Sequence, residues 1–368
     1  MVNSHYIPQF ILRNFCEDNK ITYCDLDHQK TELRNTRSVF SEMGYYPEGI
    51  EKDLCKKAEY LFANLYHNKL ENARNSIVLT RDELFILKKY LIVTAIRYRY
   101  EYTEEECALM EKLGNAFKVE FIDSLNKILN CETIDEVFQY LEMVRKHLDI
   151  AKLDKLGENP DINLFLWSEI KDIVYSYVVF VKARGDEKFL IPDIGRGICE
   201  GPMSRKKMTR LLETAISQEN PVLLQISTMI SPRDYTIYPL SKDMAILSMS
   251  SFFKLLTDSE VRMNVILPEE CPTVSAVLGF GSKDTITPPR VRNVRGTKEY
   301  IYDIRHITAA DVSHLNCLML AEAQHHIACS GLSSLKKTLE LSKEYTDREL
   351  SFLRLYSEKA DKRPKTRN

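Results

Sequence analysis

Two different spacings of hydrophobic residues divide the chain near Trp167. Before it, apolar residues recur at every third or fourth position, which predicts helices because such positions share one helical face. The exception is a short strand over residues 20–26. Thr80 with Glu83 and Thr133 with Glu136 have the spacing of capping boxes. The predicted helices cover residues 8–15, 48–71, 81–102, 104–130 and 133–149.

After Trp167 the spacing changes, and β-branched and aromatic residues become frequent, which is typical of strands. Residues 173–181 and 188–191 predict a hairpin, with its turn at Gly185. A helix is expected next over residues 204–217. Further strands are predicted at 221–229, 234–238 and 244–248.

Helical spacing returns near Thr308 and continues, with one break at Gly331, to about residue 358. The chain therefore predicts an α+β fold with a mostly helical first half, a small mixed β-sheet in the middle and long closing helices. Residues 1–358 are expected to form a single domain, helical over 1–167 and with the mixed sheet and closing helices over 168–358. The basic tail 359–368 is expected to be disordered.

The opening segment places polar residues among large apolar ones. Pro8 suits the first position of a helix, since its missing N–H costs nothing there. Gln9 and Arg13 then lie one turn apart on one face, and His5 comes just before the helix. Because Phe10 and its apolar neighbours predict burial, these polar groups need partners. The segment therefore indicates a polar centre.

Three more polar residues fall between apolar rows when the predicted helices are drawn as wheels: Glu51, Arg97 and Asn316. A buried unpaired charge costs several kcal/mol, so Glu51 and Arg97 need partners and each could serve the other. Structural ion pairs that join helices are the alternative to an active site. Asp193 follows a predicted strand end and precedes glycines, where a carboxylate either binds a ligand or caps a turn.

Composition narrows the class of protein. The 368 residues are 44% hydrophobic and 28% charged, as in soluble globular proteins. The net charge of -2 argues against a surface that coats nucleic acid, although local basic patches are compatible with this net charge. No apolar run is long enough for a membrane span, and neither a span nor a secretory signal is expected. Nine scattered cysteines without a C-x-x-C pair favour reduced thiols in the cytoplasm over a zinc site. Nucleotide-binding and hydrolase motifs are absent, and Pro192-Asp193 lacks the acidic-x-Lys strand of the PD-(D/E)-x-K nucleases.

The chain resembles a widespread family, the domain-of-unknown-function family 4238. The family opens with a His-aromatic-x-Pro-Gln-x-x-Leu-Arg-x-Phe signature, which is intact here from His5 to Phe15. Weaker matches follow in the expected order, and at Asp193 the family's Ser-Asp-Asn-Pro loop is replaced by Ile-Pro-Asp-Ile. The resemblance implies no activity. These further matches are Ile50-Glu51, Glu59, Arg97, Pro239-Leu-Ser241, Asn316 and Ala323.

Two functional hypotheses remain open. The first is a hydrolase or transferase acting on a phosphate-containing substrate, of which a toxin- or defence-type nuclease is one version. The second is a non-enzymatic binding or interaction protein in which the same residues form a structural polar core. Metal requirement, cofactors, partners and oligomeric state are not predicted. In the enzyme hypothesis the catalytic residues are His5, Glu51 and Asp193, and the substrate-binding residues are Gln9, Arg13, Arg97 and Asn316.

Overall fold

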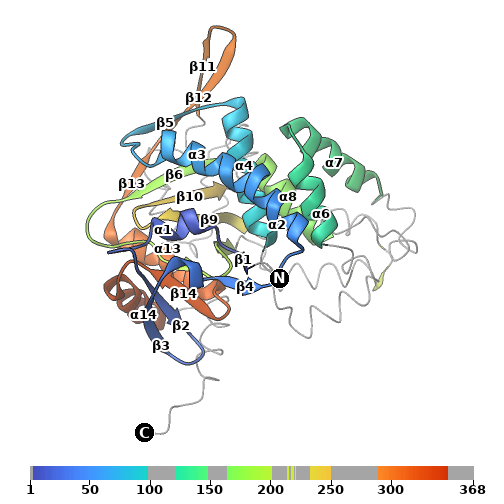
Figure 1. The fold of residues 1–368 in the computed structure, drawn as a ribbon. Coiled ribbons are helices and arrows are strands. Elements are labelled where there is room, and N and C mark those ends of the chain that lie inside the picture. The colour runs from blue at the N-terminus through green and yellow to red at the C-terminus, as the bar shows by residue number, and fades with distance from the viewer. Residues whose placement is uncertain are drawn as a thin grey trace.

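The computed structural model describes most of the chain and confirms the α+β class, with helices and small mixed sheets (Figure 1). The predicted helix 204–217, the strand 221–229 and the tail 359–368 lie largely or wholly outside the described residues, as does most of the helix 104–130. The described residues are 3–97, 121–147, 164–200, 233–249 and 289–346, with a few single positions between 214 and 220.

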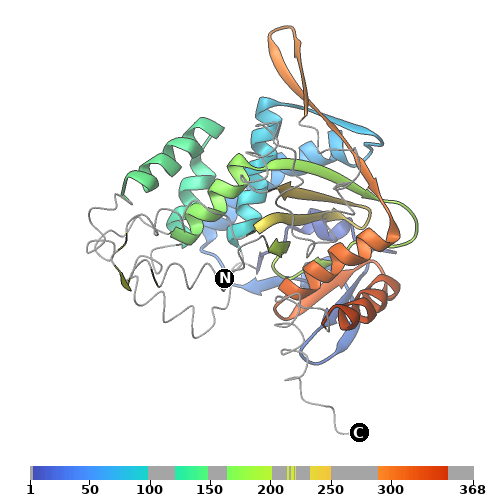
Figure 2. The ribbon, with the colours of Figure 1, turned by 180° about the vertical axis from the view of Figure 1, so that it is seen from behind.

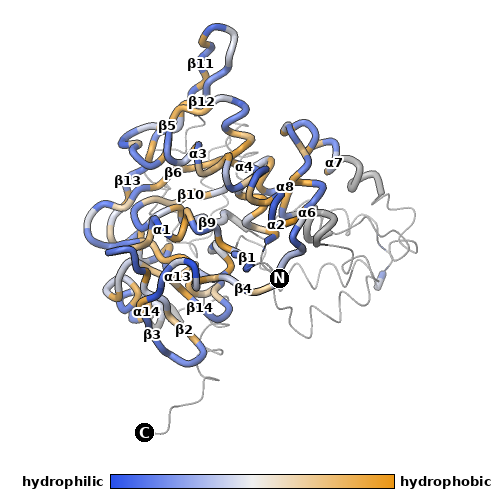
Figure 3. Tube along the Cα trace, viewed as in Figure 1, coloured by the Kyte–Doolittle hydropathy of each residue, from blue (hydrophilic) through white to orange (hydrophobic). Residues whose placement is uncertain are grey.

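A five-stranded sheet forms the centre of the molecule, in the order β13–β6–β10–β9–β8 (Figure 2). Its neighbours are antiparallel, except that β13 and β6 are parallel. Every residue of β10 is buried, and hydrophobic positions gather on this sheet (Figure 3). β9 and β10 confirm two of the predicted strands. The strands are β6 (Tyr177–Ala183), β8 (Gly197–Glu200), β9 (Arg233–Ser241), β10 (Met244–Met249) and β13 (Arg305–Ile307).

Helices pack around this sheet. The long helix α4 (Arg81–Arg97) is buried on every side from Leu87 onward, because it packs against α6 (Phe121–Asn130) and α8 (Leu164–Tyr175). α7 (Ile134–His147) packs on α8. α13 (Ala309–Glu322) covers β8 and contacts α14 (Leu332–Thr346). Within the described ranges, no helix combines the length and hydropathy that a membrane crossing requires.

Two adjacent buried lysines attach α4 to the ends of its neighbours. Lys89 Nζ donates to the carbonyl oxygens of Leu129 and Cys131, at 2.8 and 2.6 Å, where α6 ends. Lys88 Nζ donates likewise to the last turn of α8 and to the Ser176 carbonyl oxygen at 3.1 Å. Carbonyls at a helix C-terminus lack intrahelical donors and favour a cation. Both lysines therefore cap helices from a third helix.

The predicted helix over 48–71 is confirmed, but it changes its winding twice. Two five-residue π-helical segments interrupt the α-helical hydrogen bonding, and Glu59 ends the first of them. Such wide turns shift side chains relative to an ideal wheel and are frequent at functional sites. The segments are α2 (Glu48–Leu54), η2 (Cys55–Glu59), α3 (Tyr60–Leu65) and η3 (Tyr66–Leu70).

Three smaller sheets complete the fold, in the orders β3–β2–β14–β7, β11–β12–β5 and β1–β4. β2 confirms the strand predicted at 20–26. The β11–β12 hairpin turns at Arg295 and Gly296, whose φ values are 49° and 84°. The left-handed backbone at Arg295 costs about 1 kcal/mol for a residue with a side chain. The strands are β1 (Asn3–His5), β2 (Ile21–Asp25), β3 (Lys30–Arg34), β4 (Ser41–Met43), β5 (Ser76–Thr80), β7 (Ile191–Pro192), β11 (Arg290–Val294), β12 (Thr297–Asp303) and β14 (His326–Cys329).

The predicted hairpin of residues 173–181 and 188–191 is wrong. Residues up to Tyr175 belong to α8, and β6 begins only at Tyr177. β6 pairs with β10 and β13, whereas the second segment contributes only the short β7, which pairs with β14. Packing of α8 against α4 outweighs the strand preference of the β-branched residues, a common tertiary override.

The helix predicted from Thr308 up to the break at Gly331 is wrong beyond residue 322, whereas α14 confirms the helix predicted after that break. Thr308 begins α13 with a capping box to Asp311, as its sequence suggests. The helix then ends at Glu322, and His326 starts β14, which lies between β2 and β7. Beyond Glu322, the backbone N–H groups of residues 324–326 donate to the Asp193 carboxylate. These hydrogen bonds replace the ones that a continuing helix would have provided.

Candidate active site

The structure brings the polar residues of the opening segment together. His5 ends β1, which pairs with β4, and α1 (Gln9–Arg13) begins after Pro8. Gln9 Nε2 lies 3.1 Å from His5 Nε2, and Arg13 Nη2 donates to Gln9 Oε1 at 3.4 Å. Because Oε1 faces Arg13, the Gln9 amide turns its N–H toward the ring. His5 Nε2 is therefore the acceptor nitrogen of a neutral imidazole.

Glu51 lies against the backbone of the same segment. Its carboxylate accepts hydrogen bonds from the Ser4 hydroxyl and from the His5 backbone N–H. Its Oε2 atom is buried and has no hydrogen-bond partner within the described part of the chain. Burial raises the pKa of Glu51, and nearby Glu59 acts in the same direction, while Arg97 opposes them. A proton on Glu51 is thus held more firmly than on an exposed glutamate.

Arg97, the last residue of α4, has a side chain that is only 1% exposed. Its Nη1 atom donates to Glu59, and its guanidinium lies 5.7 Å from the centre of the Tyr46 ring. The Tyr46 hydroxyl donates to the Arg97 backbone carbonyl. The ion-pair partner of Arg97 is therefore Glu59, not Glu51 as the sequence suggested. The Nε and Nη2 atoms of Arg97 are buried and have no acceptor among the described residues.

The two titratable groups of this centre are shifted in opposite directions. Desolvation lowers the pKa of His5, with Arg97 acting in the same direction, while hydrogen bonds that the His5 ring donates to the backbone carbonyls of Arg37 and Thr36 oppose it. Desolvation raises the pKa of Glu51. A neutral imidazole is a base and a protonated carboxyl is an acid, so each shift favours the form that general acid–base catalysis needs. We call His5, Gln9, Glu51, Glu59 and Arg97 the N-terminal centre.

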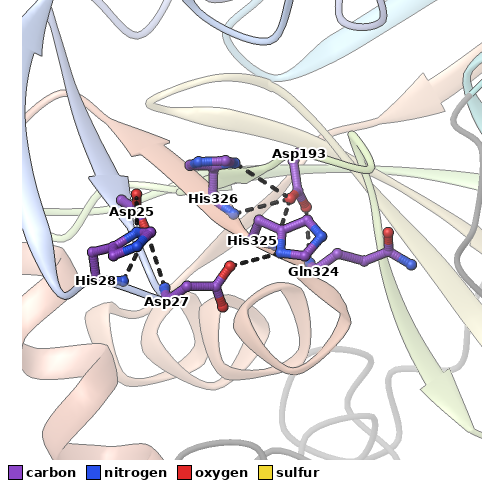
Figure 4. A network of polar contacts seen from close by, with 7 residues as sticks. All are labelled: Asp25, Asp27, His28, Asp193, Gln324, His325 and His326. Atoms are coloured by element: carbon purple, nitrogen blue, oxygen red, sulfur yellow. Dashed lines mark hydrogen bonds and ion pairs between the residues drawn. The ribbon is translucent and has the colours of Figure 1, made fainter. Parts of the chain in front are cut away.

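Asp193 lies in a different network (Figure 4). Its carboxylate, 1% exposed, accepts the backbone N–H groups of Gln324, His325 and His326 at 3.0, 2.7 and 2.9 Å. Burial raises the pKa of Asp193, and these three hydrogen bonds oppose that shift. The carboxylate thus holds the connection between α13 and β14 in place. This geometry favours the turn-capping role over the catalytic role expected for Asp193.

Histidines and aspartates continue this network toward the surface (Figure 4). His325 Nδ1 lies 2.7 Å from Asp27, in the turn between β2 and β3. The His326 ring is 4.0 Å from the Asp193 carboxylate and stacks on Tyr23, with 4.9 Å between ring centres. These contacts join three segments that are far apart in the sequence.

The loop that carries Asp193 also reaches the N-terminal centre. Gly195 has a φ of 70°, and a Cβ there would lie 3.1 Å from Thr94 and 3.7 Å from Ile7. Thr94 is one turn before Arg97 on α4, and Ile7 lies between His5 and Gln9. Asp193 therefore supports the wall of the centre through the backbone of its loop.

Asn316 serves another structural purpose. It is fully buried in α13, its Oδ1 accepts from the Leu190 N–H at 3.0 Å, and its Nδ2 donates to the Lys188 carbonyl at 2.8 Å. The amide thus pairs with the extended segment before β7 as a neighbouring strand would. Both of its polar atoms bind the chain itself, which favours a structural role over the substrate contact expected for Asn316.

Glu59 was identified from the sequence only as a family match, and no role was predicted for Tyr46 or Ser4. The π-helical turn Cys55–Glu59 explains why the role of Glu59 was missed, because it rotates Glu59 toward Arg97. Ser4 has no exposed surface and accepts from the Tyr46 N–H at 3.4 Å. The serine next to the opening histidine is visible in the sequence, but its burial is not. No signal was available for Tyr46, because its position depends on how the chain before α2 crosses α4.

Within the described residues, no group of three or more histidine, cysteine, aspartate or glutamate side chains is arranged to hold a metal ion. The N-terminal centre instead offers a neutral histidine, a carboxyl group and two guanidinium nitrogens that have no acceptor among the described residues. Such a set can bind an anionic or acceptor group and move protons.

Comparison with known proteins gives one match. The family described as "Protein of unknown function (DUF4238)" matches residues 3–330, which includes every residue of the N-terminal centre. No curated protein and no solved structure matches the chain.

Proposed function

Because this chain belongs to the DUF4238 family, for which no function is known, we propose a function from the site itself: a hydrolase or transferase that acts on a phosphate-containing substrate at the N-terminal centre. One observation carries the proposal. Among the described residues, the Nε and Nη2 nitrogens of the buried Arg97 have no acceptor, and the nearby Oε2 of Glu51 has no donor. Unmade hydrogen bonds of buried polar groups cost free energy, and a ligand that fits both would remove that cost.

Each residue has a distinct part in the proposed reaction. Arg97 binds a phosphate oxygen through its free N–H groups, as guanidinium commonly does. His5 Nε2 accepts a proton from the attacking water or alcohol, which displaces the Gln9 amide from that nitrogen. As the new P–O bond forms and the bond to the leaving oxygen breaks, Glu51 donates its proton to the leaving oxygen. Gln9, oriented by Arg13, fixes the tautomer of His5, and Asp193 acts as a positioning residue.

The substrate class follows from the charges. Glu59 already neutralises part of Arg97, so the centre suits a phosphate ester more than a free phosphate of higher charge. A nuclease of toxin or defence type is one version of this proposal. The described cysteines are free thiols, several of them buried, which fits our proposal that the protein works in the reducing cytoplasm.

Hydrolysis of two simple esters tests the proposal. The probes are 4-nitrophenyl phosphate, a monoester, and bis(4-nitrophenyl) phosphate, a diester. We expect turnover of at least one by the wild type and a loss on the order of 100-fold or more in His5→Ala, with an unchanged melting temperature. The control is His67→Ala, because His67 is exposed and forms an ion pair with Glu71 at 3.0 Å, outside the N-terminal centre. No turnover by the wild type, or equal turnover by His5→Ala, would contradict the proposal.

A binding or interaction protein is the second candidate, and a specific observation favours it. Asp193 and Asn316 satisfy their polar atoms with backbone groups of the same chain, as members of a structural polar core do. In that case His5→Ala would lower the melting temperature without affecting any turnover. The same pair of variants therefore separates the two functions.

A further inference from the structure

The β11–β12 hairpin projects from the body of the molecule in both ribbon views (Figures 1 and 2). All five residues of β11 are exposed, including Val291 at 57% and Val294 at 39%. The base of the hairpin is anchored because β12 pairs with β5 and its buried Tyr302 contacts Phe180. The tip has no such support. A protruding ribbon with exposed valines needs an explanation other than packing.

The hairpin is also basic. Residues 290–303 contain four arginines or lysines and two acidic residues, whereas the whole chain has a net charge of -2. Two of the basic residues lie in ion pairs across the strands, Arg290 with Asp303 at 2.9 Å and Arg292 with Glu299 at 2.6 Å. The other two lie at the tip, where the described part of the chain offers them no carboxylate within ion-pair distance. They are Arg295 and Lys298.

Protection of a sheet edge does not explain the tip. β11 is the edge strand of its sheet, and charged residues on an edge prevent association with other strands, which accounts for Arg290 and Arg292. Lys298 lies on the inner strand, and Arg295 lies in the turn. Arg295 also adopts a φ of 49°, a conformation in which asparagine or glycine is preferred. The turn thus carries a positively charged side chain although its left-handed backbone conformation is unfavourable for arginine.

We propose that the β11–β12 hairpin is an arm that binds duplex DNA by entering its major groove. That groove is about 12 Å wide and admits a two-stranded ribbon. Arg295 and Lys298 bind phosphates, and the exposed valines contact thymine methyl groups. The deep, narrow major groove of duplex RNA excludes the ribbon. This binding is separate from the chemistry of the N-terminal centre and requires no turnover.

Fluorescence anisotropy with the full chain tests the arm. The probe is a labelled duplex DNA of about 20 bp, roughly two helical turns, titrated between about 50 and 200 mM salt. The test variant combines Arg295→Asn, which suits the turn, with Lys298→Gln. We expect binding on the order of tenfold weaker for each lost phosphate contact, and a slope of log K against log salt that is shallower by about 0.9 per contact.

A matched variant removes two exposed lysines elsewhere, Lys20→Gln with Lys336→Gln, and is expected to bind like the wild type. Equal binding by the test and control variants would overturn the proposal. So would the absence of binding to duplex DNA, or equal affinity for single-stranded DNA, duplex RNA or phosphatidylglycerol vesicles. Because no outcome depends on catalysis, a failure here leaves the proposed function untouched, and the reverse also holds.

Discussion

Replacing Arg97 with alanine should destabilise the protein severely, and the first residue of the same helix provides the control. Arg97 is 1% exposed and its partner Glu59 is 17% exposed. Arg81 is 60% exposed and pairs with Asp135, which is 66% exposed, at 2.9 Å. Removing one partner of a buried ion pair costs about 3–5 kcal/mol, whereas an exposed pair contributes about 0.2–1 kcal/mol. The two arginines thus differ in environment and not in helix.

The cost of Arg97→Ala has a definite source. Without the guanidinium, Glu59 loses its ion-pair partner, and Glu51 loses the cation that opposes the rise of its pKa. The Tyr46 ring also loses its neighbour. A second variant isolates the electrostatic part: Arg97→Met together with Glu59→Gln removes both charges and should recover a large share of the stability.

Urea unfolding followed by circular dichroism measures the difference. With a slope on the order of 3 kcal/mol per molar, a loss of about 3 kcal/mol lowers the midpoint by roughly 1 M. Arg81→Ala should shift it by less than about 0.3 M on the same scale. Midpoints of Arg97→Ala and Arg81→Ala that agree within error would refute the assignment of Arg97 as a buried, stabilising partner.

Two further outcomes are expected. Activity requires neutral His5 and protonated Glu51. Burial lowers the pKa of His5 and raises that of Glu51, so the rate should fall toward low pH as His5 gains a proton and toward high pH as Glu51 loses one. A pH–rate profile that keeps rising toward alkaline pH would contradict this. In the same urea assay, Gly197→Ala should destabilise the protein by about 1–3 kcal/mol, because the added Cβ would lie 2.7 Å from the side chain of Met319 and 3.0 Å from the backbone of Met319. Gly49→Ala, whose added Cβ meets open space in α2, should stabilise the protein by about 0.5–1 kcal/mol.

Local chemistry made part of the fold predictable from sequence. Thr80 and Glu83 form both hydrogen bonds of the predicted capping box, because each reaches only backbone three residues away. The Thr133 hydroxyl accepts from the Glu136 backbone N–H as expected, although the Glu136 carboxylate accepts from the N–H of Glu132 and not from that of Thr133. The helix after Pro8 and its polar row depend on spacing alone. Such features are determined within one turn of chain.

Features that depend on distant segments could not be predicted in this way. His326 continues an apparently helical pattern, but its N–H donates to the Asp193 carboxylate, 133 positions away, and its segment pairs with β2 and β7 as a strand. Residues 188–190 were predicted as a strand, but the N–H of Leu190 and the carbonyl of Lys188 bind the Asn316 amide instead of a neighbouring strand. Within the N-terminal centre, spacing identified Arg97 as buried but gave it the wrong partner, because a π-helical turn is invisible in a wheel with a fixed period.

The two lysines of α4 have an evolutionary consequence. Lys88 and Lys89 bind main-chain carbonyls at the ends of α8 and α6, and every amino acid carries such a carbonyl. The attachment of both helices therefore places little demand on which residues occupy their last turns. Among homologous chains, the C-terminal turns of α6 and α8 are expected to drift freely in sequence, while the lysine pair and the helix that carries it change slowly.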